Sequence, residues 1–130
     1  RYIDDLFITW RGSERSASDF VECLNTNEDN LHLTSHISRK QIDFLDIHMT
    51  AKNNSLETVR FRKPTVGNIL LHAGSAHPRF LIESNPYGEI FRARRNCSSD
   101  LGFEKDKEII CIRLKQRGIV LNALIKQLKR

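Results

Sequence analysis

The sequence predicts an α+β fold in which strands form the first part of the chain and helices form the second. Residues 1–66 contain short apolar runs that alternate with polar residues, which is the period of half-buried strands. Residues 67–130 repeat apolar side chains three and four positions apart, the period of amphipathic helices. Pro64 ends the sheet pattern, and residues 65–75 contain two glycines and no clear period. We therefore expect two regions, 1–66 and 67–130.

The first region is expected to contain antiparallel strands and one helix. Residues 6–10 are apolar and aromatic and predict a buried strand. A helix follows, with Ser13 or Ser16 as its cap. Residues 31–37 alternate in polarity and predict a half-exposed strand. The helix is predicted from apolar residues at helical spacing, which are Ala17, Phe20, Val21 and Leu24.

A hairpin is expected next. Residues 42–50 read as one strand and residues 56–63 as its return strand, with a turn at the asparagine pair 53–54. In the return strand Arg60 and Arg62 alternate with apolar residues. The hairpin is therefore predicted to have one apolar face and one face that can meet an anion.

The helical region is marked by prolines and a glycine. Pro78 and Pro86 each predict a helix start, because proline is favoured at the first helical position. A longer helix is expected to be capped by one of residues 98–100 and to end at Gly118. Residues 99–130 then have the coarse shape of a helix-turn-helix. The last helix is predicted from the stripe Leu121, Leu124, Ile125 and Leu128.

Charge is distributed unevenly along the chain. Residues 1–59 carry 6 basic and 10 acidic side chains, a net charge of −4. Residues 60–130 carry 15 basic and 6 acidic side chains, a net charge of +9, so the whole chain has +5. A positive half favours a polyanionic partner, although a basic surface that serves only solubility would give the same count.

Composition also limits the environment of the protein. The three cysteines are widely spaced and form no Cys-x-x-Cys pair, which favours a reducing, intracellular compartment over disulfides or a zinc site. No run reaches the roughly 18 apolar residues that a membrane span needs, so no membrane partner is expected. The cysteines are Cys23, Cys97 and Cys111.

The opening residues carry the strongest chemical signal. Two adjacent carboxylates, Asp4 and Asp5, stand between Tyr2 and the apolar run of residues 6–10. Aspartate is poor inside strands and good in tight turns, so the pair is expected at the tip of a hairpin. Two carboxylates held together there suit a hard divalent cation. Taken alone, paired aspartates are more often ordinary turn residues.

Residues 1–7 resemble the Tyr-x-Asp-Asp palm signature of reverse transcriptases, in the form found in Penelope-like retroelements. The probabilities of chance matches to several separated blocks multiply, so an ordered set of blocks is more specific than the signature alone. The further blocks, in the order of that family, are Ile42-Asp43-Phe44-Leu45-Asp46, Phe61-Arg62-Lys63-Pro64-Thr65, His77-Pro78, Pro86-Tyr87-Gly88 and Arg92-Ala93-Arg94-Arg95-Asn96-Cys97-Ser98.

The resemblance implies part of an RNA-directed DNA polymerase. The first region would be the C-terminal part of the palm, and the second a helical thumb or helix-turn-helix-like region. Such enzymes hold two divalent ions about 4 Å apart, with magnesium as the usual ion. Asp4 would be the principal magnesium ligand and Asp5 its neighbour. Tyr2 would lie near the primer end, and Lys40 near the leaving pyrophosphate.

The resemblance also implies residues that hold nucleic acid. The expected partners are an RNA template and a DNA primer, as an RNA–DNA hybrid or as a DNA duplex. Phe44, Leu45 and Asp46 match the primer grip, the hairpin that holds the primer end. The expected contacts to the nucleic-acid backbone are Arg60, Arg62, Arg92 and Arg95.

The resemblance further predicts that the chain is a fragment that is inactive alone. The family needs a third aspartate from an earlier palm strand and fingers that grip the nucleotide, and neither is recognisable in this sequence. A partly exposed sheet edge is expected where those strands would pair. Two alternatives are a non-catalytic nucleic-acid-binding helix-turn-helix module and a decayed or domesticated retroelement protein. The expected location is the nucleus.

Overall fold

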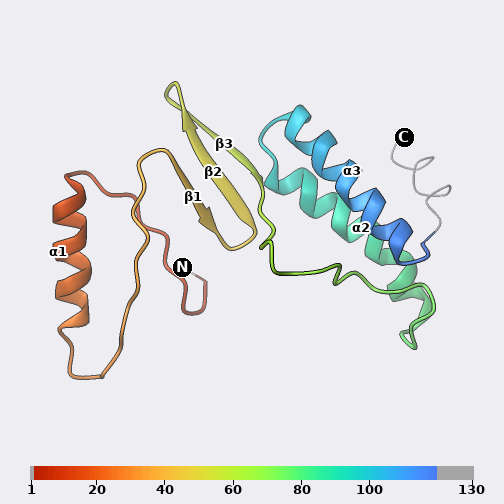
Figure 1. Cartoon of the computed structure of the whole chain (residues 1–130), viewed down its shortest axis with the longest axis horizontal. Helices are drawn as coiled ribbons and strands as arrows, with labels where there is room; N and C mark the ends of the chain where they lie inside the picture. Colours follow the sequence, from red (N-terminus) through yellow and green to blue (C-terminus); the bar gives the residue numbers. More distant parts are fainter. Residues whose placement is uncertain (1, 120–130) are drawn as a thin grey trace.

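The computed structural model describes residues 2–119 and confirms the α+β class. Figure 1 shows an elongated arrangement, with one helix at one end, a small sheet in the middle and a pair of helices at the other end. The N-terminal turn lies beside the sheet. The elements in chain order are α1 (Glu14–Asn25), β1 (Gln41–Phe44), β2 (Ile47–Lys52), β3 (Ser55–Arg60), α2 (Arg79–Asn96) and α3 (Asp100–Gln116).

The sheet is antiparallel, in the order β1-β2-β3. Its second hairpin confirms the predicted turn at Asn53 and Asn54, whose φ angles of 44° and 63° are those of a type I′ turn. Asparagine tolerates this left-handed backbone better than other non-glycine residues do. The register pairs Lys52 with Ser55 across the turn.

The prediction of one strand over residues 42–50 is wrong, because the chain reverses in the middle of it. Phe44 pairs with Ile47 across a tight turn, in which Leu45 has a φ of 55°. The backbone carbonyl of Asp46 accepts a 2.8 Å hydrogen bond from the amide of Phe61. This turn has no glycine, asparagine or proline, and its one turn-favouring residue, Asp46, stands in an otherwise alternating pattern that predicts a continuous strand.

Residues 6–10 form no strand, contrary to the prediction, and most of their apolar side chains are exposed. A strand needs a backbone partner, and no described segment pairs with this one. The run is held by side chains instead. The ring of Phe7 lies 5.6 Å from that of Phe44, and the ring of Trp10 lies 5.0 Å from that of Phe20.

Residues 31–37 also form no strand, and side-chain amides explain why. The amide oxygen of Asn25 accepts from the Leu33 amide at 2.7 Å, and its nitrogen donates to the Leu33 carbonyl at 3.0 Å. Asn27 makes the corresponding pair of bonds with Leu31. These bonds occupy backbone groups that a neighbouring strand would otherwise use.

The two edges of the sheet differ. Along β3 the α2–α3 connection takes the place of a fourth strand, since the Ser98 amide donates to the Thr58 carbonyl at 2.9 Å. The Thr58 amide donates in turn to the Ser98 hydroxyl at 2.9 Å. Along β1 no described strand pairs with the outer edge. The α2–α3 connection therefore covers the β3 edge at Thr58, whereas no described strand covers the outer edge of β1.

The core lies between α2 and α3. The buried apolar cluster that they form consists of Ile90, Ala93, Ile110 and Leu114, and Tyr87 and Phe103 pack against it. The predicted α3 is confirmed. Its N-cap is Ser99, whose hydroxyl accepts from the Gly102 amide at 3.1 Å, and Gly118 follows its end with a φ of 74°.

Pro86 does not begin a helix, contrary to the prediction, but lies inside α2. Its side chain is among the most buried of the described residues. The free energy gained by that burial offsets part of the free energy lost because proline has no N–H to donate within the helix. Pro78 is the residue that precedes the helix. The predicted last helix, and with it the second half of the helix-turn-helix pattern, lies outside the described residues.

Candidate nucleic-acid interface

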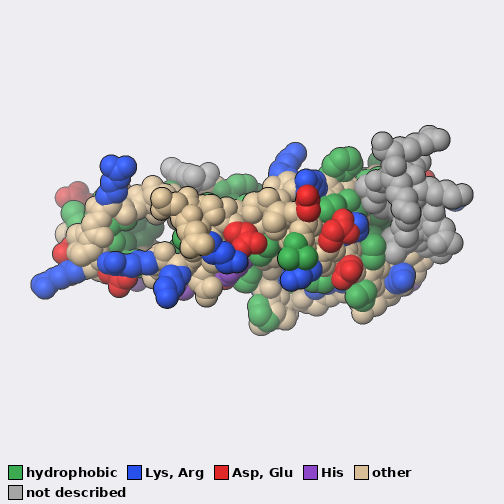
Figure 2. Space-filling view, turned by 90° about the horizontal axis from the view of Figure 1, so that it is seen from above, with side chains coloured by type: hydrophobic (Ala, Val, Ile, Leu, Met, Phe, Trp, Pro, Cys, Tyr) green, Lys and Arg blue, Asp and Glu red, His purple; other side chains and the backbone are tan. Residues whose placement is uncertain are grey.

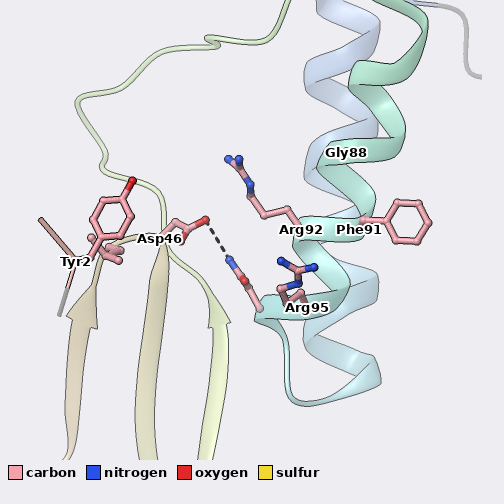
Figure 3. A pocket seen from close by; sticks show the side chains of 8 residues that line it. Tyr2, Asp46, Gly88, Phe91, Arg92 and Arg95 are labelled. Atoms are coloured by element: carbon pink, nitrogen blue, oxygen red, sulfur yellow. Dashed lines mark hydrogen bonds between the residues drawn. The ribbon is translucent and has the colours of Figure 1, made fainter. Parts of the chain in front are cut away.

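An open hollow of about 700 Å³ lies between the sheet and α2. Figure 3 shows its two walls, with Tyr2 and Asp46 on the sheet side and the face of α2 that carries Arg92 opposite them. Five of its residues were selected from the sequence as site residues, from three separate segments. The residues that line the hollow are Tyr2, Leu45, Asp46, Gly88, Phe91, Arg92, Arg95 and Asn96.

The N-terminal segment enters the hollow through a tight turn. Tyr2 and Asp5 exchange backbone hydrogen bonds of 2.9 and 2.8 Å, so a tight turn is present as predicted, but its central residues are Ile3 and Asp4 rather than the aspartate pair. Ile3 has a φ of 49°, and a β-branched residue in this region is strained. Strain of this kind costs of order 1–3 kcal/mol and occurs most often at functional sites.

Asp4 and Asp5 are both exposed at this turn. In the described part of the chain no group of three or more metal-ligating side chains comes together. Magnesium, however, is commonly held by one or two carboxylates together with water and substrate phosphates. The turn therefore presents two exposed carboxylates, a number that such a site can use, and neither of them lines the hollow.

Asp46 joins the sheet to α2. Its carboxylate accepts a 3.1 Å hydrogen bond from the side-chain amide of Asn96, drawn as a dashed line in Figure 3. Asn96 is 7% exposed and is the last residue of α2. Sequence reasoning did not select Asn96, although it belongs to the block that carries Arg92 and Arg95. A buried asparagine at a helix end has no distinctive spacing that would have singled it out.

Arg92 and Arg95 are exposed, and no ion pair joins either of them to an acidic residue among residues 2–119. In Figure 3 the side chain of Arg92 extends from α2 on the side of Asp46, whereas the ring of Phe91 points away from it. Arg94, between them, pairs with Asp100 at 2.7 Å. Two guanidinium groups at the hollow are thus available to an anion.

The predicted exposed position of Arg60 and Arg62 is wrong. Arg60 pairs with Glu89 of α2 at 2.7 Å, and Arg62 pairs with Asp106 of α3. Their side chains are only 10% and 19% exposed. Alternation along a strand cannot reveal that a helix pair covers the polar face. These arginines join β3 to the helices, so we do not include them in the interface.

Four further predicted residues do not line the hollow: Asp4, Asp5, Phe44 and Lys40. Phe44 packs on Phe7 at the end of β1 and does not line it. Lys40 precedes β1 and is exposed, and its carbonyl accepts from the Ala51 amide at 2.8 Å. Because β1 runs from that end towards the hollow, Lys40 lies on the order of 15 Å from the turn at Leu45.

Charged side chains are interspersed on the face shown in Figure 2, where basic and acidic groups alternate without a single large patch. The acidic residues near α2 and α3 also neutralise several of the arginines, as the pairs of Arg60, Arg62 and Arg94 show. The excess positive charge of the second half therefore does not itself define an interface. The arrangement of Arg92 and Arg95 at the hollow is the more specific feature.

A comparison with protein-family models, with characterised proteins and with solved structures finds no match for this chain. The family resemblance therefore rests on the residues of the sequence. Among the described residues, no helix is both long enough and apolar enough to span a membrane.

Proposed function

We propose that this chain is the part of a Penelope-like reverse transcriptase that holds the primer–template and carries the paired metal-binding aspartates. The observation that supports this proposal is the hollow. It brings together Tyr2 of the signature, Asp46 of the expected primer grip and Arg92 of the expected thumb, from three distant segments. Each of the three was selected from sequence as a site residue for the same reaction.

Each residue has a role in this proposal. Asp4 and Asp5 hold magnesium, which when bound stabilises the charge on the reacting phosphate groups. Tyr2 offers an aromatic ring on which a terminal base can stack. The bond from Asn96 fixes the turn at Asp46, so that the primer end meets a preorganised surface. The nucleus is the location that we propose for this activity.

Arg92 and Arg95 supply the nucleic-acid backbone contacts. Residues three positions apart on a helix are neighbours on its surface, so both guanidinium groups face the same region. Arginine binds phosphate through its fork of N–H donors and stays charged at all physiological pH values. Contacts of this kind position a duplex without reading its sequence.

The test is a fluorescence-anisotropy titration of the whole 130-residue chain with a labelled RNA–DNA hybrid and with DNA duplexes of several sequences. Two phosphate contacts predict a log–log salt slope of about −2 on B-form DNA. Arg92→Glu and Arg95→Glu should each weaken binding to all sequences alike, and each should make the slope shallower by about 1.

Lys105→Glu provides the matched control, because Lys105 is an exposed basic residue of α3 that does not line the hollow. It reverses one charge as the two arginine variants do, so a general charge effect would weaken binding equally in all three. The proposal fails if the parent chain does not bind the duplexes or the hybrid at low salt, roughly 50 mM. It also fails if Lys105→Glu weakens binding as much as Arg92→Glu does.

A further inference from the structure

Gly88 lies in the interior of α2, nine residues after its first residue, Arg79, and is exposed. Glycine inside a helix is unfavourable relative to alanine by roughly 0.5–1 kcal/mol, because it loses more backbone freedom on folding. A glycine at such a position therefore calls for a reason, such as crowding, an unusual backbone angle or close approach of a ligand.

Nothing within the described chain supplies the first two reasons. A Cβ atom added at Gly88 would meet no heavy atom within 4 Å. Gly102 of α3 is different, because a Cβ there would lie 3.1 Å from the Ser99 hydroxyl and from a methyl group of Val59. Gly118 differs again, since its φ of 74° favours glycine. Gly88 has neither constraint.

Its position relates it to the hollow. Gly88 lines the hollow, and Arg92 and Arg95 follow it by four and seven residues, which places all three on one side of α2. At Gly88 the helix backbone is bare, whereas one turn later a guanidinium group projects. A polyanion held by the arginines can therefore approach the helix most closely at this point.

We propose that Gly88 is the point of closest approach of a nucleic-acid strand, where the sugar–phosphate backbone lies against the backbone of α2. This inference rests on the proposed function and adds a binding residue to it. A side chain at position 88 lifts the strand from the helix and lengthens its contacts to Arg92 and Arg95. Glycine at this position lowers helix stability and leaves the space that the ligand would occupy.

The experiment compares Gly88→Ala and Gly88→Leu with the parent chain in the same anisotropy titration and in a thermal melt. Gly88→Ala should raise Tm, because alanine is the better helix former, and yet bind the duplex more weakly. Gly88→Leu should bind about tenfold more weakly than the parent and have a Tm no lower than that of the parent. Greater stability with lower affinity is a combination that a purely structural glycine does not give.

Ser18→Leu in α1 is the control, because Ser18 is an exposed, uncharged helix residue away from the hollow and receives the same apolar bulk. It should leave the affinity unchanged. If the parent binds, Arg92→Glu weakens binding and Gly88→Leu binds as the parent does, the inference about Gly88 is overturned while the proposed function stands. If the parent does not bind, both fail. Equal loss of affinity in Ser18→Leu would also overturn the inference.

Discussion

Asp106 is the acid on which the joint between the sheet and the helices depends, and Asp106→Asn tests that role. Its side chain is 6% exposed and faces two arginines of the β3 segment. Arg62 pairs with one carboxylate oxygen, and a nitrogen of Arg60 lies 4.0 Å from the other. Asparagine keeps the shape of the side chain and removes its charge.

The magnitude follows from what each arginine retains. Arg60 keeps its 2.7 Å pair with Glu89, so it remains compensated. Arg62 has no other acidic partner among the described residues and becomes a largely buried cation without a counter-charge. Removing one partner of a buried pair costs about 3–5 kcal/mol. Because Arg62 is 19% exposed and asparagine still offers an acceptor, we expect a loss of about 2–3 kcal/mol.

Urea denaturation followed by circular dichroism measures this loss as a lower midpoint with an unchanged slope. Asp100→Asn is the matched control, since it is the same substitution in the same helix and also removes an arginine partner, Arg94. That pair is solvent-exposed and should contribute less than about 1 kcal/mol. Arg62→Met added to Asp106→Asn should recover part of the stability, because it removes the uncompensated charge. Equal effects of the two aspartate variants would refute this account of the joint.

Two further predictions concern the sheet. Asn96→Asp replaces the amide that donates a 3.1 Å hydrogen bond to Asp46 with a second carboxylate. The free energy of unfolding should fall by about 1–3 kcal/mol. An unchanged urea midpoint would contradict this role for Asn96. The hydrogen bond from Lys52, and then its charge, hold the pKa of Glu57 below its usual value of 4.5, so Glu57 stabilises the β2–β3 hairpin above that pH and loses this effect as the pH falls through its folded-state pKa. The urea midpoint of Glu57→Gln should therefore fall less than that of the parent chain when the pH is lowered from about 7 to about 3. An equal fall in both proteins would count against the Lys52 pair.

Local sequence patterns were enough to predict the ends of α3, the turn at Asn53 and Asn54, and a turn near Asp4 and Asp5. The cap at Ser99 and the end at Gly118 are short-range features, since each depends on backbone groups within one helical turn. The turn at residues 53–54 needs only residues that tolerate a positive φ. A tight turn near Asp4 and Asp5 was likewise predictable from residue type.

Strands were less predictable because a strand exists only where another backbone pairs with it. Residues 6–10 have strand composition but no described partner, and residues 31–37 give their backbone groups to Asn25 and Asn27. The reversal at residues 45–46 is fixed by contacts to Phe61, far away in the sequence. Periodicity records which side chains alternate and contains no information on which segments meet.

The same distinction applies to the candidate site. The sequence by itself determined its residue types, including Tyr2, Asp46 and the arginine pair of α2, because these occur in short blocks. Only the tertiary structure decided which basic residues remain available. Arg60 and Arg62 meet acids from α2 and α3, 29 and 44 residues away, and are used inside the protein. Charge neutralisation depends on distance in space, and that distance is fixed by helix packing rather than by spacing along the chain.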